Sequence, residues 1–212
     1  MEWYLPIFKG INDQGYAEWY KPGADQMEKQ TDDNQVSLQY NDFLLSQSTG
    51  KLKHAPINGG FGLNVNYKAF SLDMSFSFSY GRYLLNEDRL KVNNLGVFGV
   101  YNFSRDILNY WKQPGDNTIY PKISNGMRVM QSDTRILEDA SFVRLKSISL
   151  SYNLPQKIIE QIKFFNGLRL FASARNIFTL TKYTGADPEF SNNISTGGYP
   201  PTRQFTLGVE LK

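Results

Sequence analysis

The clearest pattern in the chain is a strict alternation of large apolar and small polar side chains over residues 70–80. The even positions are apolar and the odd positions are polar, as in the run FSLDMSFSFSY. A period of two is the signature of a β-strand with one apolar and one polar face. Residues 61–67 alternate in the same way, and only Lys68 and Ala69 separate the two runs. The sequence therefore predicts an antiparallel hairpin with a tight turn.

The length of these runs bears on where the hairpin lies. At about 3.3 Å per residue and a tilt near 40°, ten or eleven residues cross the apolar band of an outer membrane, roughly 25 Å tall. One face of the hairpin would suit lipid and the other a hydrated lumen. A soluble sandwich would bury the same apolar face in its core, so alternation favours a membrane barrel while leaving a soluble all-β module open.

Three more strands are predicted, over residues 142–152, 168–178 and 203–212. The first is imperfect, because Arg144 and Lys146 share the parity of the apolar Ile148 and Leu150. Either that strand carries a β-bulge or it has left the lipid by that point.

The connections alternate in length. Short ones are expected at residues 68–69 and around Pro155, where Ile158, Ile159 and Ile162 predict a brief capping helix. Long polar loops are expected over 82–138 and 179–201, as on the outer side of membrane barrels, which directs the last strand toward the periplasm. Within the first long loop, Ser104 is a candidate N-cap of a short helix. Its stripe, Ile107, Leu108 and Trp111, is interpreted as packing on the base of the loop and not as a ligand site.

Residues 1–59 are the least regular part. Residues 3–8 and 16–20 are compatible with a further hairpin, and residues 23–56 are expected to form a loop on the outer side. The predicted division is thus 1–59, a hairpin and outer loop, and 60–212, the barrel strands with their long loops.

Composition narrows the chemistry. The 212 residues carry a formal net charge of +3 without blocks of like charge, which gives no footprint of a nucleic-acid binder. Cysteine is absent, so thiolate chemistry is excluded. His54 is the only histidine and is interpreted as a loop residue, which leaves almost no room for histidine-based catalysis. Adjacent carboxylates such as Glu87 and Asp88 indicate solvated loops, not a glycosidase pair. We expect no enzyme activity, no metal and no cofactor.

Several ordered motifs resemble the SusC/RagA family of TonB-dependent transporters. They are the segments EDASFVRLK and LSYNLP of residues 138–155, RNIFTLTKYTGADPE of residues 175–189, GYPP of 198–201 and FTLG of 205–208. The resemblance implies an all-β fold, in which this chain supplies the C-terminal strands of a transmembrane barrel of about 22 strands. It further implies a plug inside the barrel, a SusD-like lipoprotein lid, energy from TonB, and uptake of glycans or peptides.

In that reading the secretion leader, the plug, the TonB-contacting segment and most strands precede Met1. The family usually ends in an aromatic residue, whereas this sequence ends at Lys212. Bacterial outer-membrane lipid would surround the apolar face. The alternative function is a secreted carbohydrate-binding module.

Six residues are candidates for contact with substrate or plug. Arg169, Ser173 and Arg175 share the polar face of the fourth strand and should face the lumen, where a plug contact is the simpler role. In the last loop the candidates are Tyr183, Asp187 and Glu189. Tyr183, like Phe190 and Tyr199, could stack on sugar rings, although an interfacial aromatic girdle explains these rings more simply. Asp187 and Glu189, with Asn192 and Asn193, offer oxygen ligands to a cation, but an ordinary acidic loop is the preferred interpretation.

Overall fold

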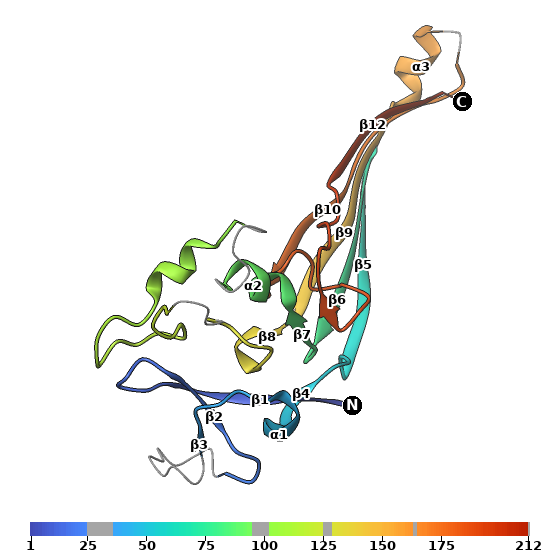
Figure 1. Ribbon diagram of the computed structural model, residues 1–212. Helices are drawn as coiled ribbons and strands as arrows, with labels where there is room; N and C mark the ends of the chain where they lie inside the picture. Colours follow the sequence, from blue (N-terminus) through green and yellow to red (C-terminus); the bar gives the residue numbers. More distant parts are fainter. Residues whose placement is uncertain (25–35, 95–101, 125–128, 163–164, 212) are drawn as a thin grey trace.

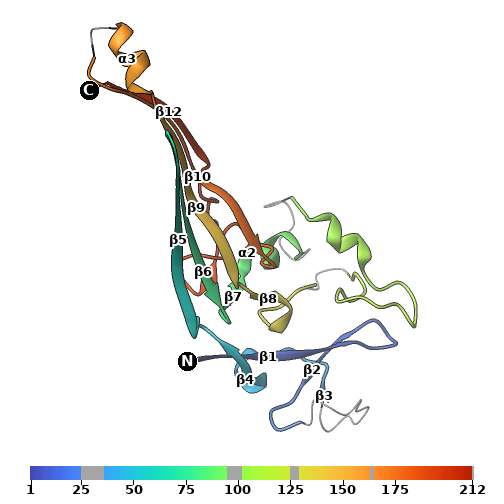
Figure 2. The ribbon, with the colours of Figure 1, turned by 180° about the vertical axis from the view of Figure 1, so that it is seen from behind.

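The computed structural model describes residues 1–24, 36–94, 102–124, 129–162 and 165–211. Within these residues the strands form one five-stranded, one four-stranded and one three-stranded sheet. The five-stranded sheet is a long arm, with the loop elements gathered at one end and helix α3 and the C-terminus at the other (Figure 1). The view from behind shows the same separation (Figure 2).

The long arm, called the wall sheet below, has the strand order β12-β10-β9-β6-β5. All its pairs are antiparallel, and the strands are β5 (Ile57–Tyr67), β6 (Phe70–Tyr80), β9 (Phe142–Asn153), β10 (Leu168–Thr181) and β12 (Gln204–Leu211). Tyr67 pairs with Phe70 across the two-residue turn, where Lys68 takes a φ of 53°. The predicted hairpin and the three later strands are confirmed.

A β-bulge at Lys146 explains the irregular parity of β9. Ser75 pairs with Ser147, but the next residue on β6, Phe76, pairs with Leu145. Lys146 therefore has no pairing partner on β6. The β10 side is irregular at the same level, between Arg175 and Phe178. Because one extra residue moves every following side chain to the other face, the bulge brings Arg144 onto the polar face. The bulge interpretation is confirmed.

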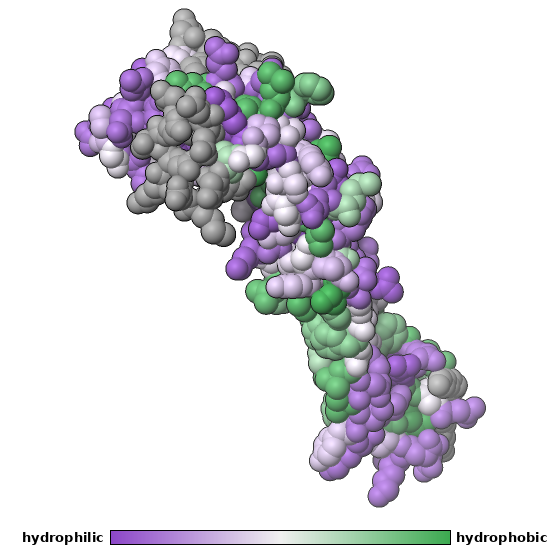
Figure 3. Space-filling view, turned by 90° about the horizontal axis from the view of Figure 1, so that it is seen from below, coloured by the Kyte–Doolittle hydropathy of each residue, from purple (hydrophilic) through white to green (hydrophobic). Residues whose placement is uncertain are grey.

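The wall sheet has one apolar and one polar face. A typical apolar row crosses the strands at Leu63, Met74, Ile148, Ala174 and Phe205, and the adjacent polar row at Asn64, Asp73, Ser149, Ser173 and Thr206. The apolar face is open to its surroundings, since Phe205 is 74% and Leu207 86% exposed. Figure 3 shows apolar side chains gathered along the narrow sheet, with polar ones at both ends.

The elements at the loop end share a core. Strands β1 (Glu2–Ile11), β2 (Ala17–Tyr20), β3 (Val36–Ser37) and β4 (Ser46–Leu52), with helix α1 (Asp42–Leu45), form the four-stranded sheet. Trp3 and Leu5 of β1 pack with Ile107, Met130 and Ile136 of the first long loop. The predicted N-terminal hairpin is confirmed. The expectation of a plain loop over 23–56 is wrong in part, because β4 pairs with β1 and β3 with β2; residues 25–35 lie outside the described part.

The first long loop also contains regular elements. These are β7 (Tyr83–Asn86), α2 (Glu87–Val92), the 3₁₀ helices η1 (Arg105–Asn109) and η2 (Thr134–Ile136), and β8 (Leu137–Asp139). Ser104 caps η1, as predicted, by accepting from the Asp106 amide. The expected apolar stripe is wrong in one member, because Ile107 is buried while Leu108 is 64% exposed. A 3₁₀ helix has three residues per turn instead of 3.6, which turns adjacent side chains apart.

At the other end of the wall sheet, helix α3 (Gln156–Ile162) caps the β9–β10 connection, as predicted. Ile159 is buried, whereas Ile158 is 45% exposed. The short strand β11 (Ile194–Ser195), in the last loop, runs parallel to β7 and completes the three-stranded sheet at the loop end. Among the described residues, no helix is long and apolar enough to cross a membrane.

Candidate functional site

The polar face of the wall sheet carries three of the predicted site residues. Ser173 lies in the row of Ser149 and Thr206, and Arg169 lies nearer the α3 end. Arg169 donates to the Ser151 hydroxyl over 3.2 Å and lies 3.6 Å from a Glu210 oxygen. Arg175 is exposed and makes no ion pair with any described residue. Their shared face is as predicted, while a contact with plug or substrate remains a prediction.

Asp187 and Glu189 are brought together by Arg144, which the bulge places on the polar face. The Arg144 side chain is 4% exposed and ion-pairs with Asp187 and, over 2.7 Å, with Glu189. Its Nε donates to the Thr179 hydroxyl over 2.9 Å, and the Lys146 ammonium lies 2.7 Å from Glu189. Both carboxylates therefore hold the last loop against β9 and β10.

This arrangement supports the structural interpretation of the acidic loop. Within the described residues, no cluster of histidine or carboxylate side chains has the geometry to hold a metal ion. Asn192 and Asn193 bind Arg82 instead of a cation. The Asn192 carbonyl and the Asn193 side chain accept hydrogen bonds from the Arg82 guanidinium at 3.0 and 3.3 Å.

Tyr183 is a core residue of the loop end and not an exposed stacking platform. It packs with Leu84, Ala140 and Phe190, and its side chain is buried. Burial raises the pKa of its hydroxyl above the ordinary value. Tyr199, in contrast, is 95% exposed.

Glu138 joins the two long loops. Its carboxylate accepts from the Thr184 amide at 2.8 Å and from the Asn86 amide group at 3.2 Å, and it ion-pairs with Arg89 at 3.1 Å. Burial opposes the charge on Arg89, but hydrogen bonds to Tyr120 and Glu138 outweigh it and raise the pKa of the guanidinium.

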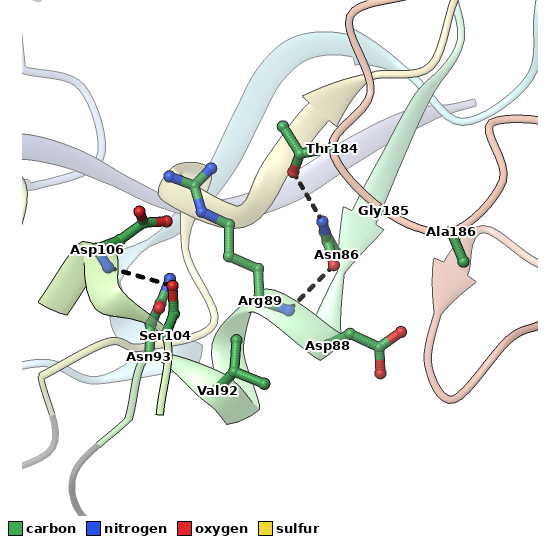
Figure 4. A pocket seen from close by; sticks show the side chains of 10 residues that line it. All are labelled: Asn86, Asp88, Arg89, Val92, Asn93, Ser104, Asp106, Thr184, Gly185 and Ala186. Atoms are coloured by element: carbon green, nitrogen blue, oxygen red, sulfur yellow. Dashed lines mark hydrogen bonds between the residues drawn. The ribbon is translucent and has the colours of Figure 1, made fainter. Parts of the chain in front are cut away.

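Beside this junction lies a pocket of about 440 Å³, drawn in Figure 4. Its volume is in the range of small-ligand sites. The walls come from α2, from the start of η1 and from the last loop, and they consist of Asn86, Asp88, Arg89, Val92, Asn93, Ser104, Asp106, Thr184, Gly185 and Ala186.

Two groups in the pocket are unusual. Asn93 is fully buried and donates from Nδ2 to the Tyr120 hydroxyl over 3.1 Å, yet its Oδ1 has no hydrogen-bond partner among the described residues. The exposed Asp106 carboxylate, likewise, has no partner in the described part of the chain. Sequence reasoning missed this pocket, because its walls come from segments about a hundred residues apart.

Comparison with solved structures identifies the architecture. The RagAB peptide transporter superposes with a TM-score of 0.85 over 99% of this chain and 22% of its own, at 34% identity. The RagAB peptide importer in its closed-closed state gives a TM-score of 0.83 over 98% of this chain and 22% of its own, again at 34% identity. This chain belongs to the SusC/RagA family of TonB-dependent outer-membrane transporters.

Curated relatives agree with the family. The TonB-dependent receptor P3 of Formosa agariphila is 33% identical over 165 residues, which cover 72% of this chain and 16% of the receptor. TonB-dependent receptor SusC of Bacteroides thetaiotaomicron is 26% identical over 153 residues, 72% of this chain and 15% of SusC. This SusC/RagA chain thus spans about 16% of the length of the curated relatives it matches. No family model matches it.

Proposed function

We propose that this SusC/RagA chain forms part of the wall and the outer loops of an outer-membrane importer of glycans or peptides. The import is powered through TonB and assisted by a SusD-like lipoprotein. The observation that carries the proposal is the wall sheet, with one exposed apolar face and one polar face. A soluble carbohydrate-binding module would bury Phe205 and Leu207, whereas both are exposed on an open face.

The edges of the sheet support a larger barrel. β5 pairs only with β6, and β12 pairs only with β10, among the described strands. An unpaired strand edge in lipid costs several kcal/mol for each unsatisfied backbone group. The remaining strands of the barrel, outside this chain, would pair with both edges and close the ring around the plug.

The two ends of the wall sheet suggest its orientation. The short turn between β5 and β6 lies beside the end of β9 that leads into helix α3, and the large loop elements lie at the other end of the sheet (Figure 1). Because outer-membrane barrels have short periplasmic turns and long outer loops, we assign the α3 end and the C-terminus to the periplasm. Arg169, Ser173 and Arg175 would then line the lumen and contact the plug, and the loop end would meet the lipoprotein.

The test compares two aspartate substitutions in the complete protein, expressed in a deletion strain of its source bacterium. Leu72→Asp places a charge on the apolar face, and Ser71→Asp places the same charge on the polar face of the same strand. We expect Leu72→Asp to lower the amount of protein in the outer membrane severalfold, because a charge facing lipid is destabilising. Ser71→Asp should assemble normally.

Uptake completes the test. The deletion strain should lose uptake of labelled peptides or oligosaccharides, and the complete gene should restore it only when the membrane is energised. Protein that purifies as a monodisperse species from plain buffer, or uptake unaffected by the deletion, contradicts the proposal.

A further inference from the structure

We propose that the pocket between α2, η1 and the last loop binds a protonated primary amine, and specifically the amino group of a peptide. The inference rests on the proposed import function and deepens it by naming the chemistry that the outer loops select.

The groups left over in the pocket are mainly acceptors. Asn93 Oδ1 is a buried acceptor without a partner among the described residues, which is costly unless a ligand or water supplies a donor. Ser104 Oγ accepts from the Asp106 amide at 3.2 Å, and its own hydrogen is free to turn toward a second acceptor. Figure 4 shows Asn93, Ser104 and Asp106 side by side at one end of the pocket.

The charge in the pocket has the sign that favours a cation. Arg89 lines the pocket, but its guanidinium is directed to Glu138 at 3.1 Å and to the Arg135 carbonyl at 3.4 Å. Its charge is therefore balanced by Glu138. Asp88 accepts from the Gly197 amide at 2.8 Å through one oxygen, which leaves the other open. Asp88 and Asp106 are left without a cation among the described residues.

An ammonium group meets these conditions better than a neutral hydroxyl. It carries three donors and a full positive charge, so it can satisfy more than one acceptor and balance the charge of the Asp106 carboxylate. Hydrogen bonds in which both partners are charged are stronger than neutral ones. None of the described residues that line the pocket is aromatic, so none of them offers a ring on which a sugar could stack. A peptide is favoured over an amino sugar, because the 34% identical solved relatives are peptide importers.

The test measures binding of two probes to the complete transporter in detergent. The probes are hexa-alanine with a free amino end and the same peptide with an acetylated amino end. We expect the free peptide to bind roughly tenfold tighter, since acetylation removes the charge and leaves the acceptors unpaired. The preference should fade above about pH 8, where an α-amino group loses its proton.

Variants assign the preference to this pocket. Asp106→Asn should reduce the ratio between the two peptides to nearly one, and it keeps the backbone amide that Ser104 caps. Asp13→Asn is the matched control, because Asp13 is an exposed carboxylate on another turn at the loop end, and it should keep the tenfold ratio. Equal binding of both peptides, no binding of either, or an unchanged ratio in Asp106→Asn overturns the proposal.

The outcome is separable from that of the import proposal. Uptake of oligosaccharides without a preference for the free amine would contradict the amine site but not the proposed import function. A preference for the free amine without energised uptake would support the amine site and contradict the import function.

Discussion

Arg144 on β9 lies opposite Ser77 on β6, on the polar face, although its sequence parity is that of the apolar Ile148. The bulge at Lys146 moves the Arg144 side chain to the polar face, and on that face it forms ion pairs with Asp187 and Glu189. One extra residue thus anchors the last loop to the wall sheet.

Removal of this anchor should be costly. Arg144→Met leaves Asp187 and Glu189 without their buried partner, and breaking a buried pair costs about 3–5 kcal/mol. We expect a value near the lower end, about 3 kcal/mol, because Glu189 is 36% exposed and also pairs with Lys146. Urea unfolding of the complete protein in detergent measures the loss.

Arg175→Met is the matched control for that experiment. Arg175 is exposed on the same face and has no ion pair with a described residue, so its substitution should change the free energy of unfolding by less than about 0.5 kcal/mol. Similar losses in both variants would show that the Arg144 cluster does not anchor the loop.

Trp19 and Asp133 connect the N-terminal sheet to the first long loop. The Trp19 indole donates to Asp133 over 2.8 Å, and Asp133 also pairs with the buried Arg135 over 2.7 Å. Trp19→Phe keeps most of the ring but removes the donor, at a cost of about 1–3 kcal/mol. Hydrogen exchange should increase in both β2 and η2. Tyr4→Phe, at an exposed position of β1, should change neither.

Two glycines on β5 differ in the space beside them. A Cβ on Gly60 would lie 2.8 Å from the Phe76 carbonyl oxygen, whereas one on Gly62 would lie 3.4 Å from the Met74 oxygen. Gly60→Ala must push the β5 and β6 backbones apart, and we expect a loss of about 1–3 kcal/mol. Gly62→Ala should be close to neutral. Unfolding midpoints that are equal for the two variants would contradict the close approach at Gly60.

Tyr40 should make the loop end sensitive to alkali. Burial, followed by the charges of Asp42 and Asp133, raises the pKa of its hydroxyl well above the ordinary value. A raised folded-state pKa gives stability that is present below the unfolded pKa of about 10 and is lost as the pH rises toward the folded value.

Tyr40→Phe tests this dependence. The variant loses the 3.0 Å hydrogen bond to the Ser132 carbonyl, at about 1 kcal/mol near pH 8. Its free energy of unfolding should then fall less between pH 9.5 and 11.5 than that of the parent. An identical decline in parent and variant would exclude Tyr40 as the group responsible.

The strands of the wall sheet could be predicted from the sequence because each of them shows a local alternation of apolar and polar residues. The Phe70–Tyr80 strand and its hairpin follow from period-two pattern and a two-residue turn, both of which are visible in a short window. The position of Arg144 in the sequence indicated the bulge, since a cation among apolar positions is costly unless its side chain leaves the lipid.

The loop end was less predictable, for a physical reason. β4 has the sequence SQSTGKL, without an apolar face, and becomes a strand through pairing with β1. Asn93 and Asp106 meet Thr184 only after the two long loops fold together around Glu138. Such contacts depend on tertiary packing, which no local period records.

The most direct test of the membrane wall is the environment of two neighbouring residues on β12. Spin labels at Leu207→Cys and Thr206→Cys, in the complete protein reconstituted in liposomes, report their accessibility to oxygen and to a water-soluble nickel complex. We expect the label at position 207 to be accessible to oxygen dissolved in the lipid, and the label at position 206 to be shielded from lipid on the lumenal side. Equal accessibilities, or a label at 206 that is the more exposed to lipid, would contradict it.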